Sequence, residues 1–314
     1  MADEIQSYKL VCSGGLNSNE NHLFLSEAAA GAATRLVNYE PSLYGGYRRI
    51  EGFSLLDSLN VEVGAGVAEG PVLSVAIYKN EHIGNPYIIA ARKDIGANTY
   101  KFYKNIPLSG WQVMTNSLTL NTTVGSRTVK KLRHAQFDFG DGSKIIFVDG
   151  VNNAILFDGQ NWSQLNSTNT GGTSSPGGNQ IVNAPAIVEV FENHIFLGGD
   201  LTSRAVICHS APADPFDFTS ASGGGQITPG FNVVQFKPFR DDLFVFGING
   251  IKKVSPDLTA GFVLDQVTAN VGCVARDSVM EIGGDLIFLS PEGFRPVAGT
   301  SRIGDVEIQT LSKP

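Results

Sequence analysis

Few residues of this 314-residue chain have the type and spacing that catalysis or metal binding requires. None of the five histidines lies two or four positions from another histidine, so no pair of ligands is set on one face of a strand or helix. His134 and His194 both occupy strand positions of a repeat, where a structural role is the simpler interpretation. The motifs of zinc peptidases, serine hydrolases and phosphate-binding loops are absent. We therefore predict no catalytic residue, no metal site and no cofactor.

The acidic residues favour turns over a reaction centre. The stretch 138–142 has the spacing of the start of a calcium loop but lacks the acidic ligand that closes one, so a tight β-turn is favoured. Asp242 and Asp285 recur just before an apolar strand, which predicts a turn-capping role. A glycosidase needs two carboxylates facing each other across a pocket, and the sequence singles out no such pair.

Aromatic residues recur near the ends of the repeated units, at Trp111, Trp162, Phe216 and Phe218. Packing between neighbouring units is the simpler interpretation of this recurrence. A platform on which sugar rings stack is the alternative. It keeps a carbohydrate-binding or glycan-cleaving β-propeller open as a second function.

The composition limits the classes of partner. Hydrophobic residues make up 42% of the chain, enough for a core, whereas charged residues make up only 17%, below the usual value of about 25%. A surface poor in charge suits burial against protein partners, although a surface rich in Ser, Thr and Asn would give the same figure. With a net charge of −7 and no long basic run among 23 Lys and Arg residues, binding to nucleic acid through phosphate contacts is disfavoured.

The cysteines and the hydropathy indicate the compartment. Cys12, Cys208 and Cys273 lie far apart, which favours small buried thiols in a reducing environment over a disulfide framework. The acidic start lacks the apolar centre of a signal peptide, and no window approaches the roughly 18 apolar residues of a membrane span. We expect a protein folded in a cytoplasm without a membrane anchor.

A repeated pattern of strands dominates the chain. An apolar run, a Gly, Asp or Asn turn and a second apolar run recur five times, with starts about 57, 50, 48 and 43 residues apart. The first apolar runs of these copies are Tyr87–Ala91, Lys144–Val148, His194–Leu197, Asp242–Phe246 and Asp285–Leu289. Repeats of this period built from short strands are typical of propeller blades.

The predicted fold is therefore all-β, a single β-propeller of about five to six blades over residues 47–314, after an extended N-terminal arm over residues 1–46. The most continuous apolar runs, at 145–148, 243–246 and 286–289, predict central strands buried between blades. Asp158-Gly159 predicts a hairpin turn. The alternating segment 301–310 suits a strand that closes the ring. Two stacked β-sandwiches would show the same strands and stay open as an alternative.

Three stretches near the N-terminus and one later stretch resemble a known family. They are Gly14–Asn19, Ala33–Pro41, Leu43–Phe53 and Ser210–Phe218. These stretches resemble the β-propeller tail proteins of short-tailed bacteriophages, which include tail nozzle, tail tubular protein B and tail hub or stabilisation proteins. With 314 residues, there is room for a propeller and little else, so a hub or adaptor-bound ring stays open beside a nozzle.

The resemblance implies a virion structural protein without catalysis. Such a protein would form a ring, most simply a homohexamer, below the portal and adaptor, continue the channel through which genome DNA passes, and hold tail fibres or spikes. It would be assembled in the host cytoplasm and reside in the virion tail. A cytosolic scaffold similar to kelch repeats is a further alternative; it would be monomeric and lack the arm.

The stretch Tyr39–Arg49 is the candidate docking element of the arm. Tyrosine and arginine are the types that anchor protein interfaces. The candidate interface residues are Tyr39, Tyr44, Tyr47, Arg48 and Arg49. A plain first strand with its turn is the alternative interpretation.

Overall fold

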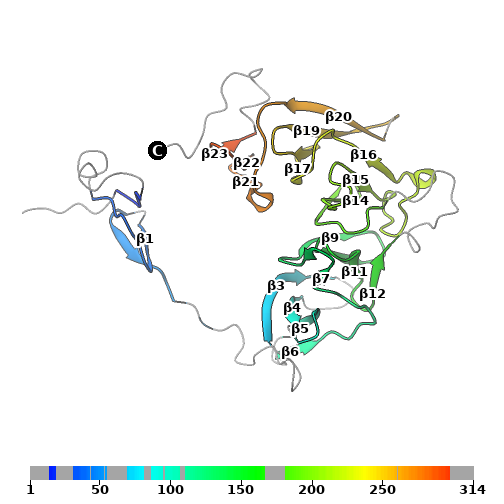
Figure 1. Ribbon diagram of the computed structural model, residues 1–314, viewed down its shortest axis with the longest axis horizontal. Helices are drawn as coiled ribbons and strands as arrows, with labels where there is room; N and C mark the ends of the chain where they lie inside the picture. The colour runs from blue at the N-terminus through cyan, green and yellow to red at the C-terminus, as the bar shows by residue number, and fades with distance from the viewer. Residues whose placement is uncertain are drawn as a thin grey trace, which may run out of the picture. The chain divides into compact units, whose positions relative to one another are not determined.

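The chain folds as two units of very different size. The computed structural model, drawn in Figure 1, describes residues 14–18, 31–42, 44–52, 54, 69–80, 86–94, 96–106, 110–166, 181–259 and 261–297. Contacts divide the chain into a first unit, Met1–Ser58, and a second unit, Leu59–Pro314. The described residues are almost entirely β: their helical elements are two single 3-10 turns, η1 (Ser220–Ser222) and η2 (Arg276–Ser278).

Antiparallel sheets follow one another along the second unit, and each sheet pairs its strands in chain order. The first sheet holds β3 (Glu69–Tyr78), β4 (Tyr87–Asp94), β5 (Thr99–Ile106) and β6 (Gly110–Val113), and the second holds β9 (Arg133–Asp138), β10 (Ser143–Val148), β11 (Ala154–Phe157) and β12 (Trp162–Leu165). The third holds β13 (Ile187–Phe191), β14 (His194–Gly198), β15 (Ile207–His209) and β16 (Gly225–Ile227), and the fourth holds β17 (Gln235–Phe239), β18 (Asp242–Phe246), β19 (Ile251–Asp257) and β20 (Gly261–Thr268). The fifth holds β21 (Met280–Ile282), β22 (Asp285–Ser290) and β23 (Gly293–Pro296), and a small hairpin of β7 (Thr123–Val124) and β8 (Arg127–Thr128) precedes β9.

The first strands of successive sheets are neighbours, as in a β-propeller. Strand β9 contacts both β3 and β13, and β13 contacts β17. The later strands of each sheet lie progressively farther from this inner row, as Figure 1 shows for β3 to β6. The all-β, propeller-type fold predicted from the repeats is therefore confirmed. The number of blades stays a prediction, because residues 298–314, including the expected closing segment 301–310, lie outside the described residues.

The core consists of separate layers between consecutive sheets. Four clusters of buried side chains lie between the first and second, second and third, third and fourth, and fourth and fifth sheets. In the first layer the rings of Phe102 and Trp162 stack at 4.3 Å, so Trp162 has the packing role expected of it. Each of two stacked sandwiches would instead bury a single layer between its own two sheets, so that alternative is wrong.

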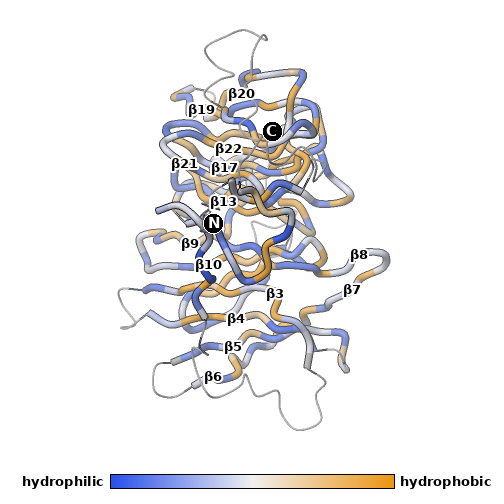
Figure 2. Tube along the Cα trace, turned by 90° about the vertical axis from the view of Figure 1, so that its left-hand side faces the viewer, coloured by the Kyte–Doolittle hydropathy of each residue, from blue (hydrophilic) through white to orange (hydrophobic). Residues whose placement is uncertain are grey.

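The sequence of a strand decides how deeply it is buried. In the second sheet every residue of β10 is buried, because apolar side chains alternate onto two covered faces. Strand β22 holds the same place in the fifth sheet but alternates buried and half-buried residues, with Ile287 and Leu289 on the less covered face. In Figure 2 the hydrophobic stretches lie mostly on strands and the hydrophilic ones mostly on connections. Central position is thus confirmed for the three predicted runs, whereas complete burial holds only for β10.

Short aspartate-capped turns connect the strands. Between β11 and β12 a carboxylate oxygen of Asp158 accepts hydrogen bonds from the backbone N–H of Gln160 at 2.8 Å and of Asn161 at 2.6 Å. Gly159 adopts φ 99°, a conformation that favours glycine. The turn predicted from Asp158-Gly159 is confirmed.

The first unit contains a small hairpin of β1 (Tyr39–Pro41) and β2 (Tyr47–Arg49). A bridge between Leu16 and Ala33 brings the preceding chain back on itself, so the described part of this unit is folded locally and not simply extended. Since β2 pairs with β1, residues 47–49 belong to the first unit. The division falls between Ser58 and Leu59, later than the boundary after residue 46 that the sequence predicted.

Candidate functional sites

The hairpin of the first unit presents most of the residues expected to anchor an interface. Its register places Tyr39 opposite Arg49 and Glu40 opposite Arg48. The Nε atom of Arg48 donates a hydrogen bond to Oε1 of Glu40 at 2.6 Å, and both side chains are largely exposed. An exposed ion pair of this kind adds little stability, so both groups remain available to a partner.

Tyr47 has a different position from the other four residues. Its hydroxyl lies 2.8 Å from the carbonyl oxygen of Gly15 and 2.7 Å from that of Gly31, so its O–H hydrogen bond is shared between them. The side chain therefore ties β2 to two earlier segments. Of the five candidates, Tyr47 is the one with an evident structural task inside its own unit.

Large side chains in the described part of the first unit are open to solvent. Tyr44, in the turn between β1 and β2, is 100% exposed, and Tyr39 is 50% exposed. Leu16, Val37 and Ile50 are also exposed apolar side chains of this unit. None of the described residues of the first unit is buried. Exposed apolar and aromatic side chains gathered in this way are typical of a surface that a partner covers.

The histidines of the third sheet are packed as structural residues. The Nδ1 atom of His194 lies 2.6 Å from the carbonyl oxygen of Ser210, which fits a donated hydrogen bond. The ring of His209 lies 4.9 Å from that of Phe262 and 5.4 Å from that of His194. Burial lowers the pKa of His209 to about 4, so this ring is neutral at pH 7. Within the described residues, His, Cys, Asp and Glu form no group of three or more that could hold a metal ion.

The acidic residues singled out in the sequence have structural partners. Asp138 accepts hydrogen bonds from the backbone N–H of Gly140 at 2.8 Å and Gly142 at 3.3 Å, which confirms a β-turn at this place. Asp242 instead bonds across to β19, where the Nζ of Lys253 lies 3.1 Å from its carboxylate and the hydroxyl of Ser255 donates to it. The turn-capping role predicted for Asp242 is therefore wrong.

The buried thiols show no sign of reactivity. Cys208 and Cys273 are free and buried, as the sequence predicted for these two. Burial raises the pKa of Cys208 to about 12, which keeps it protonated at neutral pH. Cys12 lies outside the described residues.

Among the described residues, no helix has the length and apolar character needed to cross a bilayer.

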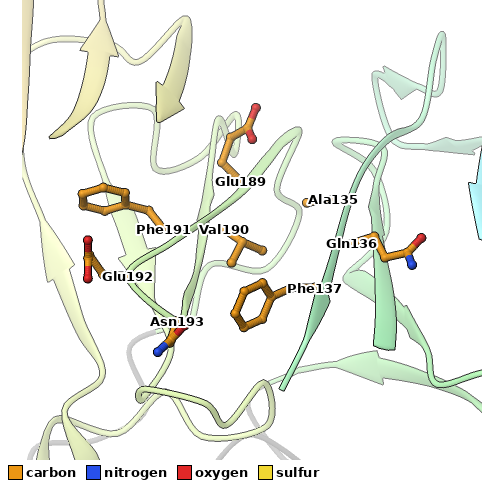
Figure 3. A pocket seen from close by; sticks show the side chains of 8 residues that line it. All are labelled: Ala135, Gln136, Phe137, Glu189, Val190, Phe191, Glu192 and Asn193. Atoms are coloured by element: carbon orange, nitrogen blue, oxygen red, sulfur yellow. The ribbon is translucent and has the colours of Figure 1, made fainter. Parts of the chain in front are cut away.

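A cavity of about 490 Å³ lies between β9 and β13, lined by residues 135–137 and 189–193. In the close-up of Figure 3 the side chains of Phe137 and Val190 point toward one another, whereas Gln136 points away from them. Glu189 in its wall has a pKa raised by burial and lowered in part by Lys237, whose Nζ lies 2.7 Å away. Its carboxylate is thus already paired, and no second polar group converges on it to suggest chemistry.

A second cavity, of about 380 Å³, was not predicted from the sequence. We call it the arginine pocket, and its lining consists of Arg133, Gly199, Leu201, Arg204, Asn232, Val233, Val234, Ile248, Val274 and Arg276. Arg133 begins β9, and the other residues lie in the segments after β14, before β17, after β18 and before β21, so four sheets contribute. Its arginines are separated by 71 and 72 positions in the chain, so no local motif could have joined them.

Comparisons with known proteins add no family. No family model matches the chain, and no curated protein matches it. Solved structures to which it is similar include BBS1N in complex with ARL6DN, in crystals soaked with mercury (10% identity, TM-score 0.40) and with lead (10%, 0.39). Another is the extracellular domain of the hybrid two component system BT4673 from B. thetaiotaomicron (13%, 0.39).

These alignments are partial. They cover 74%, 77% and 80% of this chain but only 66%, 66% and 34% of the respective matched chains, just under two thirds for the first two. With TM-scores below 0.5 they are weak likenesses of shape. The propeller-type fold described above rests on the chain's own sheets.

Proposed function

We propose that this protein is a non-enzymatic structural component of a bacteriophage tail, built into a ring below the portal and adaptor through its first unit. The observation that carries the proposal is the first unit itself. It exposes Tyr39, Tyr44, Arg48 and Arg49 on one small hairpin and has no buried side chain among its described residues. Exposed aromatic and cationic side chains on a small hairpin gain a fixed position when a partner covers them.

The type of partner is inferred from the sequence. The sequence stretches that resemble short-tailed phage tail proteins lie mostly in this same unit, at residues 14–19, 33–41 and 43–53. The low charged fraction of 17% suits a protein that covers much of its surface with neighbours. A net charge of −7 suits a wall past which DNA slides without adhering, because like charges repel. The proposed partners are an adaptor or portal protein, tail fibres or spikes, and further copies of the chain in a hexameric ring.

The test is assembly of purified full-length protein, measured by light scattering with and without the adaptor protein of the tail. We expect the 33.5 kDa chain to form a ring in the presence of the adaptor. Tyr44→Ala combined with Arg48→Ala should weaken that assembly by at least about tenfold, as loss of interface anchors does. Leu258→Ala, which changes an equally exposed residue of the second unit, is the matched control and should assemble normally.

Two outcomes would contradict the proposal. Normal assembly of the Tyr44→Ala, Arg48→Ala variant would exclude docking through the hairpin. A full-length protein that stays monomeric with the adaptor and binds or cleaves sugars on a glycan array would favour the carbohydrate-directed alternative instead.

A further inference from the structure

The arginine pocket has a geometry that suits a negatively charged ligand. One side of it is formed by the segment Cys273–Val279, which we call the axial loop and which leads into β21. The axial loop reaches the second sheet: the Nε and Nη2 atoms of Arg133 donate to the two carboxylate oxygens of Asp277 at 2.7 and 2.9 Å. It is also fixed to the fifth sheet, where the backbone N–H of Val274 donates to the carbonyl oxygen of Leu289 at 2.9 Å. The pocket wall is therefore built from rigidly held chain.

Arg276 is the central residue of the pocket. Its Nε donates to the carbonyl oxygen of Val234 at 2.8 Å, which fixes the guanidinium plane. A Cβ added at Gly199 would lie 3.3 Å from Nη2 of Arg276, so the absence of a side chain there leaves room for the guanidinium. Its two Nη groups have no hydrogen-bond partner among the described residues. A half-buried guanidinium with a fixed plane and two unused donor groups is well suited to bind a planar anion in a bidentate way.

The charges around the pocket do not cancel. Asp277 forms ion pairs with both Arg133 and Lys131, and the Nζ of Lys131 lies 3.4 Å from its carboxylate. Asp200 is paired with Arg127 at 3.6 Å. Among the described residues, neither Arg204 nor Arg276 forms an ion pair with a carboxylate, although Asp277 next to Arg276 in the chain acts on it electrostatically. In a chain with a net charge of −7, this local excess of positive charge is a feature that an anion would neutralise.

Apart from the exposed Asn232, the side chains of the remaining wall are apolar. Leu201, Val233, Val234, Ile248 and Val274 contribute branched aliphatic side chains, and Leu201, Ile248 and Val274 are largely exposed. A small inorganic ion would leave these groups in contact with water. A ligand with an aliphatic part would cover them and gain roughly 25 cal/mol for each Å² of apolar surface removed from water. The volume of about 380 Å³ is in the range of small-ligand pockets.

We propose that the arginine pocket binds a carboxylate carried on a short aliphatic body, with Arg276 as the bidentate anchor and Arg204 as the second cation. An amino-acid-sized carboxylate, such as the end of a peptide chain or a free organic acid, has both parts. This inference rests on the geometry of the second unit and is independent of the docking role proposed for the first.

The experiment is isothermal titration of the full chain with three probes at pH 7: N-acetyl-leucine, its neutral amide and inorganic phosphate. We expect binding of N-acetyl-leucine and at least about tenfold weaker binding of both the amide and phosphate, because each lacks one of the two recognised parts. Arg276→Gln keeps a donor near Val234 but removes the charge, and should weaken N-acetyl-leucine binding by about tenfold or more. Arg240→Gln changes an exposed arginine in the turn after β17 and should leave binding unchanged.

The proposal is overturned by any of four results. These are no binding of N-acetyl-leucine, equal binding of the amide, equal binding of phosphate, and an unchanged affinity in the Arg276→Gln variant. Thermal unfolding of each variant shows that lost binding does not come from lost structure. For a variant that unfolds, Arg204→Gln replaces it, with a smaller but measurable loss expected because Arg204 is exposed.

Discussion

The two units of this chain differ in how far their side chains are buried. In the second unit whole strands are enclosed, as in β10, where all six residues are buried between neighbouring sheets. In the first unit the hairpin of β1 and β2 carries two tyrosines and a proline beside three charged side chains, and none of its described residues is buried. The difference lies in what surrounds the strands, since each sheet of the second unit has another sheet to pack against.

This contrast separates stability from assembly. Folding free energy comes largely from apolar surface removed from water, so the sheets supply nearly all of it. Exposed aromatic residues contribute little to folding but retain their full apolar area for a partner. The same residue type is therefore expected to matter for stability in one unit and for binding in the other.

The largest expected effect sharpens this contrast directly. Phe147, 1% exposed and with its ring 4.9 Å from that of Phe102, should cost about 3–5 kcal/mol of unfolding free energy when replaced by alanine. Tyr44→Ala, the matched aromatic deletion in the first unit, should change it by less than about 0.5 kcal/mol. Urea denaturation followed by fluorescence measures both. Similar losses in the two variants would remove the distinction between the units.

A second effect concerns His209 and pH. Its pKa in the folded protein is about 4 because burial disfavours the charged ring, whereas an unfolded histidine has a pKa of about 6.5. As the pH falls, the imidazole therefore takes up its proton in the unfolded chain before it does so in the folded protein. The contribution of the neutral His209 to the free energy of unfolding is complete above pH 6.5 and is lost as the pH falls toward 4. The loss amounts to about 3 kcal/mol.

Denaturation midpoints measured from pH 4 to pH 7 check this prediction. His209→Gln has no ring to titrate and should show a flatter dependence of stability on pH. An identical slope in the wild type and in the His209→Gln variant would mean that the buried ring is not the source of the acid sensitivity.

The smallest expected effect is confined to the first unit. Tyr47→Phe removes the hydroxyl shared by the carbonyl oxygens of Gly15 and Gly31, a loss of about 1 kcal/mol for a single hydrogen bond. Hydrogen exchange of amides in residues 31–50 should speed up by roughly fivefold, while unfolding of the second unit stays unchanged. Tyr39→Phe is the control, because its hydroxyl has no hydrogen bond among the described residues. Equal exchange in both variants would show that Tyr47 does not hold this unit together.

Local pattern predicted the strands well. Apolar alternation and the turn residues gave β10, β11 and the Asp158 turn almost to the residue, because these features depend on neighbours close in sequence. Burial was predicted less well: β22 has an apolar run similar to that of β10 but a less covered environment on one face. Position within a sheet can be read from a repeat, whereas the cover on each face depends on other parts of the chain.

The candidate sites show the same limit. The exposed hairpin was predictable in outline, since tyrosine and arginine gather within eleven residues, 39–49. The inward role of Tyr47 was not, because its partners lie 32 and 16 positions away. Asp242 and Asp285 share a repeat position, yet Asp242 bonds to the side chains of Lys253 and Ser255 on β19, the strand paired with its own. The arginine pocket needs residues from four sheets, which no single stretch of sequence brings together.

The ion pair between Arg133 and Asp277 joins residues 144 positions apart. At a synthesis rate of roughly 5–20 residues per second, its second half leaves the ribosome about 7–29 s after the first. Until then Arg133 lacks the carboxylate of Asp277, and the last completed sheet has no following sheet to pack against. Earlier sheets should therefore be the first to become protease-resistant on a nascent chain, and the axial loop should be the last.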